Sequence, residues 1–479
     1  MREKYSTLSM AQLRELAKVR GIKGIFSMHK EELVDALVAE EEEFRKQEKS
    51  EPSKPAEEKP VRESAPAEPK SEAEKTQERP ADRPAVPRPV RNNEIYDEKT
   101  FPKELDSGEE ACGIFEQVEG YGFIRCANFM PGDNDVYVAP SQVRKFGLKT
   151  GDILRGNKRV KTQQEKFAAL LYIKTINGYS TEEAVKRGSF DEMTPIFPDE
   201  RIKLECPGCS IAMRVTDLIS PVGKGQRGMI VSPPKAGKTT LLKEVAKSIL
   251  YSNPKMHMLI LLIDERPEEV TDIKEAIIGE NVEVIYSTFD ELPEHHKRVS
   301  EMVIERAKRL VEHKEDVVIL LDSITRLTRA YNMVVPSSGR TLSGGLDPAA
   351  LHMPKKFFGA ARNMREGGSL TILATALVDT GSKMDDVVYE EFKGTGNMEM
   401  VLDRKLSEKR IFPAIDLAKS GTRREDLLLS PDELEAINVM RRSLNGLKSE
   451  EATDRILDLF AKTKDNTEFV QMVKKNRFI

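Results

Sequence analysis

A segment near the middle of the chain, with a lysine and a threonine after a glycine, could bind the phosphates of a nucleotide. The segment, Ser232-Pro-Pro-Lys-Ala-Gly-Lys-Thr-Thr240, follows a short apolar run and opens a run with helical spacing. At such a helix start, backbone N–H groups point at phosphate oxygens and the helix dipole favours their charge. Lys238 would reach the outer phosphates, and the Thr239 hydroxyl would bind Mg²⁺. The segment predicts ATP and Mg²⁺ as cofactors, although Ser232 stands where the general P-loop pattern has glycine.

Two carboxylates at the ends of apolar runs could complete a hydrolytic site. Asp322 ends the run VVILLD, and a carboxylate at the tip of a buried strand can hold Mg²⁺, here together with Thr239. Glu265 ends the run LLIDE. Hydrolysis needs a carboxylate that orients and deprotonates water beside the outer phosphate, and we predict that Glu265 is this base. The alternative is a salt bridge in a charged turn.

Alternating aromatic residues earlier in the chain could bind single-stranded RNA. They occur in GYGFIR, residues 120–125, and in DVYV, residues 135–138. Residues two apart on a strand share a face, so these rings would form a platform on which bases stack. An arginine at the end of GYGFIR would add charge or guanidinium stacking, and a later phenylalanine would complete the base pocket. A core face is the alternative for such a pattern, but nearby basic residues favour RNA. The candidate residues are Tyr121, Phe123, Arg125, Asp135, Tyr137 and Phe167.

Two glycine- and serine-rich segments each carry one cation. VVPSSGRTLSGGLD, residues 334–347, contains Arg340, and VDTGSKMDD, residues 378–386, contains Lys383. In a ring, such loops could line a central pore and grip the phosphates of a nucleic acid. Plain surface loops are the alternative.

The elements that must position these residues follow from hydrophobic periodicity. Short runs with period two, punctuated by glycine, predict a five-stranded OB- or cold-shock-like barrel; they are GIFEQVEGYGFIRC, NDVYVAPSQV, GDILRGNKRV and FAALLYIKTI. Continuous apolar runs that alternate with helical stretches predict buried parallel strands; they are MIVS, HMLILLID, VEVIYST, VVILLD and SLTILATAL. Three helical stretches follow from residue 430.

Composition limits the class of protein. The net charge is −4 over 479 residues, so any nucleic-acid site must be a local patch. No apolar signal core or membrane-length run is present, and we expect a cytoplasmic protein without membrane contact. Four cysteines are too few for a disulfide framework in a chain of this length. Cys206-Pro-Gly-Cys209 is expected to be a turn, with a redox pair or a metal shared between subunits as alternatives.

The order of these motifs resembles the Rho family of bacterial transcription termination factors. The resemblance rests on a helical cap and a barrel with GYGFIR and DVYV, followed by PPKAGKTT, LLIDERPEEVT, LLDSITRL, GGLDPAALHMPKKFFGAARN, DTGSKMDD, EEFKGTGNMEM and SGTRRED. It covers residues 108–479 and, more weakly, 5–42. It implies a homohexameric ring that loads on C-rich single-stranded RNA. ATP hydrolysis would then pull the RNA 5′ to 3′ towards RNA polymerase and its elongation factors.

With this resemblance, the expected fold is a multidomain α/β chain. The expected domains are a helical N-terminal cap at 1–42, a linker at 43–104, the OB- or cold-shock-like RNA-binding barrel at 105–178, a connector at 179–224, and a RecA-like P-loop ATPase motor with C-terminal helices at 225–479. The linker is predicted to be disordered from its composition, which is acidic, rich in proline and nearly free of large apolar residues, and it is extra relative to the shorter family members.

The resemblance also implies roles for further residues. Arg423, in SGTRRED, would be an arginine finger that reaches the ATP of a neighbouring subunit, and Arg410 would be a second interface cation. Arg266 would help to position groups at the site, and Phe412 would lie against adenine. The implied phosphate-binding residues are Lys235, Ala236, Gly237, Lys238, Thr239 and Thr240.

Two positions depart from the family pattern. Arg340 stands where the family more often has lysine, which keeps the charge but alters the phosphate geometry. Phe167 stands where tyrosine is usual, which keeps the stacking surface but removes a hydroxyl.

Two other functions remain open at this point. A rotary-ATPase-type subunit would share the motor fold but would lack the aromatic set of the barrel. A non-catalytic RNA-binding protein would use ATP only structurally, and the presence of both Glu265 and Lys238 argues against it.

Overall fold

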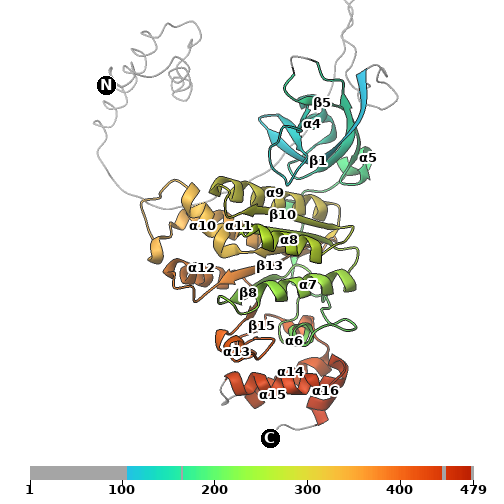
Figure 1. Ribbon diagram of the computed structural model, residues 1–479. Helices are drawn as coiled ribbons and strands as arrows, with labels where there is room; N and C mark the ends of the chain where they lie inside the picture. The colour runs from blue at the N-terminus through green and yellow to red at the C-terminus, as the bar shows by residue number, and fades with distance from the viewer. Residues whose placement is uncertain (1–104, 163–164, 445–448, 476–479) are drawn as a thin grey trace, which may run out of the picture. The chain divides into compact units, whose positions relative to one another are not determined.

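The computed structural model describes residues 105–162, 165–444 and 449–475 (Figure 1). The predicted helical cap at 1–42 and the predicted linker at 43–104 lie outside the described residues. Among the helices that are described, none is long and apolar enough to cross a membrane.

The N-terminal part of the described chain is a closed β-barrel. Its strands are β1 (Asp106–Val118), β2 (Tyr121–Arg125), β3 (Val136–Val138), β4 (Ile153–Arg159), β5 (Ala168–Ile176) and β6 (Tyr179–Ser180). They run in the order β3-β2-β1-β4-β5-β6, and a parallel pairing of β3 with β5 closes the barrel. Phe115, Ile124 and Leu154 are fully buried in its core. The predicted barrel is confirmed, and β6 extends its sheet beyond residue 178.

A short helix, α4 (Pro140–Phe146), occupies part of a segment that the strand pattern did not predict to be helical. Proline at the first position suits a helix start, and Gly147 at φ 55° ends the helix in the left-handed conformation. The side chain of Gln142 accepts from the backbone N–H of Ala139 and donates to the Leu170 carbonyl of β5. These bonds attach α4 to the barrel, and Phe146 is buried in its core.

The motor is built on a mostly parallel sheet. Its strands are β8 (Arg227–Ser232), β9 (His257–Glu265), β10 (Val282–Thr288), β11 (Asp316–Asp322), β13 (Ser369–Leu377) and β14 (Met398–Val401), with antiparallel additions β7 (Pro195–Ile196), β12 (Arg362–Met364) and β15 (Gly421–Thr422). The main order is β10-β9-β11-β13-β8-β14-β15. All five predicted motor strands are present. Because β7 pairs with β12, the predicted connector contributes to the motor sheet.

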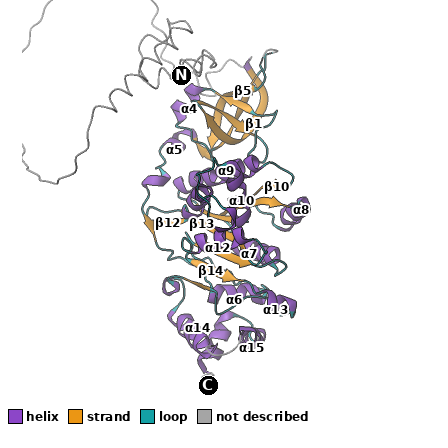
Figure 2. Ribbon diagram, turned by 90° about the vertical axis from the view of Figure 1, so that its left-hand side faces the viewer, coloured by secondary structure: helices purple, strands orange, loops and turns teal. Residues whose placement is uncertain are grey.

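Helices cover both faces of this sheet (Figure 2). The helices are α6 (Ile211–Ile219), α7 (Lys238–Ser252), α8 (Pro267–Ala276), α9 (Pro293–Glu312), α10 (Ile324–Val334), α11 (His352–Gly359), α12 (Lys383–Lys393) and α13 (Arg404–Glu408). Successive strand residues point to opposite faces. Ile260 of β9 therefore packs in the core that contains α7, whereas Leu261 packs in the core that contains α9. This two-sided burial explains why the strands read as continuous apolar runs.

Three C-terminal helices pack on α6: α14 (Pro431–Leu444), α15 (Ser449–Ala461) and α16 (Asn466–Lys475). Arg214 of α6, which is 5% exposed, anchors them. Its guanidinium donates to the carbonyls of Phe460 at 2.9 Å, Thr463 at 2.7 Å and Asp465 at 2.8 Å. These carbonyls lie at the end of α15 and just after it, where helix geometry leaves them without intrahelical donors.

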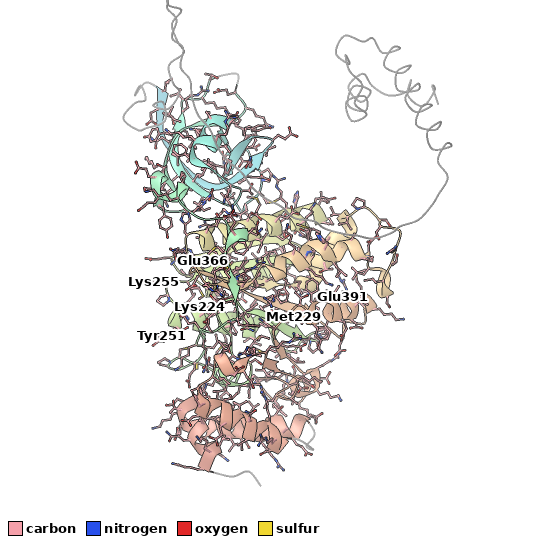
Figure 3. The ribbon with its side chains drawn as sticks, turned by 180° about the vertical axis from the view of Figure 1, so that it is seen from behind. Lys224, Met229, Tyr251, Lys255, Glu366 and Glu391 are labelled. Carbon is pink, nitrogen blue, oxygen red and sulfur yellow. The ribbon has the colours of Figure 1, made fainter. Side chains whose placement is uncertain are left out.

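The connector also contains α5 (Thr181–Val185) and a turn. Lys224, labelled in Figure 3, places its Nζ 2.5 Å from Glu200 and 2.8 Å from Asp316 at the start of β11. In the CPGC segment, the Cys209 N–H donates to the Cys206 carbonyl at 3.0 Å, so the expected turn is present.

Candidate functional site

The phosphate-binding segment lies between β8, which ends at Ser232, and α7, which begins at Lys238. Gly237 precedes the helix with φ 94°, a conformation that favours glycine. The first N–H groups of α7 have no intrahelical acceptor and face the segment, as an anion site requires. The Ser407 hydroxyl of α13 donates to the Lys235 carbonyl at 2.9 Å and attaches the phosphate-binding segment to that helix.

Lys238, Glu265 and Asp322 meet where three segments end. Lys238 Nζ donates to Glu265 Oε1 at 3.0 Å and to Asp322 Oδ1 at 2.6 Å. Asp322 pairs with Leu262 in the parallel register of β11 and β9, and this register brings the ends of the two strands together. The Glu265 and Asp322 side chains are only 4% and 1% exposed. Thr375 of β13 donates to Asp322 Oδ1 at 2.7 Å and fixes that carboxylate.

The charges of this cluster shift the pKa values of two of its members. Burial raises the pKa of Glu265, and the nearby charge of Asp322 raises it further, while Lys238 and Arg326 oppose the shift. Burial disfavours the charged form of Lys238, but the two carboxylates outweigh it and raise the pKa of the lysine. Glu265 is therefore a buried carboxylate with an elevated pKa, as a general base near neutral pH requires.

Arg326 belongs to the same cluster, and the sequence analysis did not predict it as a site residue. It lies in the first turn of α10, four residues after Asp322, and its Nη1 donates to the carbonyl and to Oδ2 of Asp264. Its Nε lies 3.7 Å from Glu265 Oε1 and has no hydrogen-bond partner among the described residues. The LLDSITRL motif contained this arginine, but only the sheet register shows that it reaches the end of β9.

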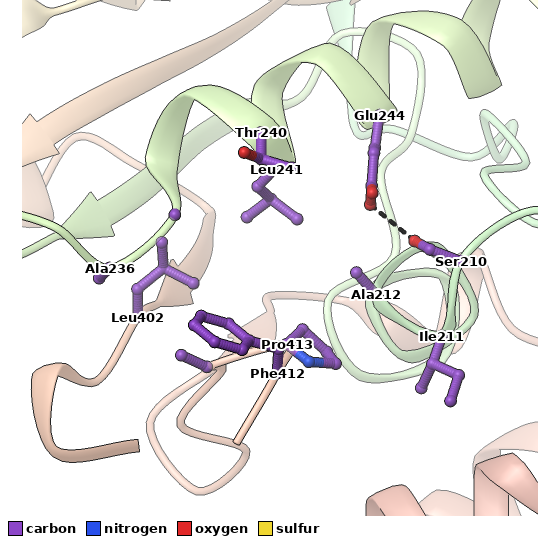
Figure 4. A pocket seen from close by; sticks show the side chains of 12 residues that line it. Ser210, Ile211, Ala212, Ala236, Thr240, Leu241, Glu244, Leu402, Phe412 and Pro413 are labelled. Carbon is purple, nitrogen blue, oxygen red and sulfur yellow. Dashed lines mark hydrogen bonds between the residues drawn. The ribbon is translucent and has the colours of Figure 1, made fainter. Parts of the chain in front are cut away.

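A cavity of about 490 Å³ opens beside the phosphate-binding segment (Figure 4). Ala236, Gly237 and Thr240 line one side, and Phe412 with Pro413 lines another. The lining residues that complete it are Ser210, Ile211, Ala212, Leu241, Glu244, Leu402 and Ala414. The Phe412 ring is 53% exposed and could cover a flat heterocycle. The structure thus brings Ala236, Gly237 and Thr240 to one cavity with Phe412, whereas Lys235, Lys238 and Thr239 do not line it.

The three further arginines of the predicted site are exposed, and none of them lines the cavity beside the phosphate-binding segment. Arg266 directly follows Glu265 and caps α8, and its side chain is exposed. Arg410 is exposed after α13. Arg423 is exposed at the end of β15 and lines a separate cavity of about 630 Å³ beyond β14, which contains no residue of the phosphate-binding segment.

The aromatic residues of the barrel form one cluster of half-buried rings. Phe123 lies 5.8 Å from Tyr121, 6.0 Å from Tyr137 and 5.2 Å from Phe167, measured between ring centroids. The rings meet because Tyr121 and Phe123 lie two apart on β2, and the pairing of β2 with β3 places Phe123 directly opposite Tyr137. We call Tyr121, Phe123, Tyr137 and Phe167 the aromatic surface.

Arg125 packs against the Phe123 ring of the aromatic surface and is itself buried. It is 8% exposed, its Nε donates to Glu116 at 2.7 Å, and its Nη1 donates to Asp135. Its guanidinium carbon lies 4.8 Å from the centroid of the Phe123 ring. Because two carboxylates balance its charge, Arg125 stacks beneath Phe123 and is not a free surface cation. Asp135 is 2% exposed and acts as its ion-pair partner.

The two cation-bearing segments of the motor are in contact. A Cβ atom on Gly344, in the segment of Arg340, would lie 2.4 Å from the backbone N of Met384. Lys383 is the first residue of α12, so the part of its segment from this residue onward is helical and not a loop. Both Arg340 and Lys383 are exposed. The buried Asp385 carboxylate accepts from Arg329 and Thr380 and holds the start of α12.

Comparisons with known proteins agree with this division into two sites. Residues 111–182 match the family model for the Rho termination factor RNA-binding domain, and residues 212–422 match that for the nucleotide-binding domain of the ATP synthase alpha/beta family. Transcription termination factor Rho of Bacillus subtilis is 53% identical over 76% of this chain and 84% of its own length. The Rho protein of Pseudomonas aeruginosa is 54% identical over 78% and 90%.

Among solved structures, the assembled ATPase EscN of an enteropathogenic E. coli type III secretion system has a TM-score of 0.50 at 19% identity, covering 66% of this chain and 78% of that one. At this identity the likeness shows a shared motor fold alone. The RNA-binding domain distinguishes this chain from a subunit of that kind. The chain carries a nucleotide-binding ATPase domain and an RNA-binding domain, and it belongs to the Rho family of transcription termination factors.

Proposed function

We propose that the chain is an RNA-dependent ATPase that moves along single-stranded RNA from 5′ to 3′ and terminates transcription by RNA polymerase. The observation that carries this proposal is the coexistence of two candidate sites in one chain. The aromatic surface offers four rings to bases, and the Lys238–Glu265–Asp322 cluster offers a base and a cation to a bound triphosphate.

In the proposed reaction, Glu265 accepts a proton from the attacking water. Burial and the charge of Asp322 raise its pKa towards the range in which a base works at neutral pH. Lys238 leaves its two carboxylate partners and binds the outer phosphates, and this departure raises the proton affinity of Glu265 further. Arg326, held by Asp264, stays near Glu265 and orients it.

The cluster fits a divalent cation. Asp322 contributes carboxylate oxygens, and Thr239 lies in the first turn of α7, so the donors are the oxygens that Mg²⁺ prefers. The ammonium of Lys238 already lies 2.6 Å from Asp322 Oδ1, which shows that this carboxylate accommodates a positive charge. We propose that Thr239 and Asp322 would hold Mg²⁺, which would neutralise charge on the phosphates.

The outlying arginines favour an assembly. Arg423 lines a cavity separate from the phosphate-binding segment, so a second copy would bring it to a nucleotide. An arginine supplied in this way accelerates hydrolysis by about 10³–10⁵. We propose a homohexamer in which Arg423 and Arg410 act across subunit interfaces, Arg266 positions groups beside Glu265, and Arg340 and Lys383 contact RNA in the pore.

C-rich RNA is the proposed ligand of the aromatic surface, and RNA polymerase with its elongation factors is the proposed target in the cytoplasm. Both proposals rest on family membership. The aromatic surface itself accounts for binding of unpaired bases, because stacking needs a free base face.

A strand-displacement assay tests the direction and the energy source together. The substrates are RNA–DNA duplexes with a C-rich single-stranded RNA tail on the 5′ or the 3′ side. We expect ATP-dependent release of DNA only from the 5′-tailed substrate, and no release with Lys238→Ala. Release from the 3′-tailed substrate, or equal release without ATP, would contradict the proposal and favour a non-catalytic RNA-binding function.

A further inference from the structure

The CPGC segment forms a turn that holds two thiols close together. The Cys209 N–H donates to the Cys206 carbonyl at 3.0 Å, and Gly208 has φ 74°, so the four residues form a type II β-turn with Pro207 in its second position. In such a turn the first and last Cα atoms lie within about 7 Å, and a disulfide needs about 4.4–6.8 Å. The Cys206 N–H also donates to Cys209 Sγ at 3.4 Å.

Both cysteines are free, and the turn is open to solvent on one side. The thiols are half-buried, whereas Pro207 and Gly208 at the tip are exposed. A small reagent can therefore approach the pair. Burial raises the pKa of the Cys209 thiol, although the backbone N–H of Cys206 opposes the shift. The reactive thiolate is therefore scarcer at neutral pH than in an ordinary cysteine, and oxidation becomes faster as the pH rises.

The turn contacts the helix that carries the phosphate-binding lysine. Cys206 Sγ lies 3.9 Å from the hydroxyl of Ser248, a buried residue of α7. Ser210, directly after Cys209, caps α6 and donates to Glu244 of α7 at 2.6 Å (Figure 4). Ser210 and Glu244 both line the cavity beside the phosphate-binding segment. The turn therefore stands where α6 and α7 together form one wall of that cavity.

We propose that Cys206 and Cys209 are a reversible disulfide site whose oxidation weakens nucleotide binding. The oxidant is a small-molecule disulfide. The thiolate of one cysteine attacks it and displaces one small thiol, and the second thiolate then attacks the mixed disulfide and displaces the other. One S–S bond forms in the protein, the S–S bond of the oxidant is reduced to two thiols, and the protons of the two cysteines pass to those thiols.

The expected effect follows from the contacts that the bond would break. An S–S bond of about 2.05 Å would fix the Cys206 sulfur against that of Cys209, and we expect this to disturb its 3.9 Å contact with Ser248. The backbone before Ser210 then shifts relative to α7, which disturbs the Ser210–Glu244 hydrogen bond in the cavity wall. We expect the dissociation constant for nucleotide to rise about threefold or more. This coupling rests on the proposed nucleotide site, whereas the disulfide itself does not.

The test uses the full chain with Cys112→Ser and Cys126→Ser, because those exposed barrel cysteines would also react. The protein is treated with oxidised glutathione, and peptide mass spectrometry identifies the products. Binding of a fluorescent N-methylanthraniloyl ADP is measured by anisotropy in the reduced protein, after oxidation, and after dithiothreitol. The matched control adds Cys206→Ser and Cys209→Ser to the same chain with Cys112→Ser and Cys126→Ser, and it is treated in the same way.

We expect a peptide that lacks two hydrogen atoms and links Cys206 to Cys209, together with weaker ADP binding that dithiothreitol restores and that the control does not show. Glutathione adducts without the internal bond, or no reaction, would overturn the disulfide site. An internal bond with unchanged ADP affinity would overturn the coupling. Failure of the reduced protein to bind ADP would overturn the nucleotide site, and the mass spectrum would still decide the disulfide.

Discussion

Replacement of Lys238 by alanine in the nucleotide-free protein should destabilise the fold, in addition to abolishing hydrolysis. The ammonium lies between two carboxylates that are 4% and 1% exposed, and it is the cation that donates hydrogen bonds to both. Without it, Glu265 and Asp322 repel each other in a poorly solvated site. The variant therefore tests whether the cluster has the charge arrangement on which the proposed chemistry depends.

The magnitude follows from the burial of the three groups. Breaking a buried ion pair by removing one partner costs about 3–5 kcal/mol. The Lys238 side chain is 15% exposed and Glu265 can take up a proton, which lowers our expectation to roughly 2–4 kcal/mol. At about 2–4 °C for each kcal/mol in a domain of this size, the midpoint of thermal unfolding should fall by on the order of 5–10 °C.

The loss should depend on pH in a defined direction. The folded-state pKa of Glu265 is raised above its ordinary value, so the folded state binds the extra proton, and stability falls as pH rises through the folded-state pKa. Without Lys238 that pKa rises further. The deficit relative to the unchanged protein should therefore be larger at about pH 7.5 than at about pH 5.5.

Scanning calorimetry of the nucleotide-free protein measures this effect. Lys243→Ala is the matched control, since Lys243 lies on the same helix and pairs with an aspartate that is 53% exposed, which contributes about 1 kcal/mol at most. Adding Glu265→Gln to Lys238→Ala should restore most of the midpoint. Unfolding of Lys238→Ala at the same temperature as Lys243→Ala at both pH values would contradict a stabilising role for the Lys238 ammonium.

Three further perturbations probe other parts of the molecule. Phe123→Ala should weaken binding of single-stranded C-rich RNA by roughly 1–3 kcal/mol in an anisotropy titration; equal loss in the control Phe197→Ala, an exposed phenylalanine outside the barrel, would deny the ring a specific role. Arg423→Ala should reduce ATP turnover by about 10³-fold or more while ATP still binds; mixing it with Lys238→Ala should partly restore activity, and a fully inactive mixture would contradict action across subunits. Arg214→Ala should leave buried carbonyls unpaired, at about 1–3 kcal/mol each, and expose the C-terminal helices to limited proteolysis; unchanged cleavage would show that they are held by apolar packing alone.

The strands of the motor could be predicted closely because both faces of the sheet are covered. The run VVILLD covers the buried residues of β11, and the run SLTILATAL coincides with β13. A strand that is apolar on both sides is visible in the sequence as one uninterrupted segment, and its ends mark the point where burial stops. The carboxylates at the ends of β9 and β11 were found for the same reason.

Features that depend on contacts between distant segments could not be predicted. Helix α4 is short, and its bonds to β5 come from the closure of the barrel. The contact of Arg326 with Asp264 depends on the register of β9 and β11, and the neutralisation of Arg125 depends on Asp135 across the strands. The strand pattern predicted correctly that Arg125 lies on the barrel. It could not show that two carboxylates enclose the guanidinium, because those carboxylates come from another strand and from a loop.

The dependence of ATP turnover on RNA tests the central claim most directly. Steady-state hydrolysis is measured for the full chain with no polynucleotide, with single-stranded C-rich RNA, and with a DNA strand of the same sequence, alongside Phe123→Ala. We expect many-fold stimulation of ATP turnover by the RNA and little stimulation by the DNA, and Phe123→Ala should need a higher RNA concentration for the same stimulation. Turnover that is the same under all three conditions would contradict coupling between the aromatic surface and the Lys238–Glu265–Asp322 cluster.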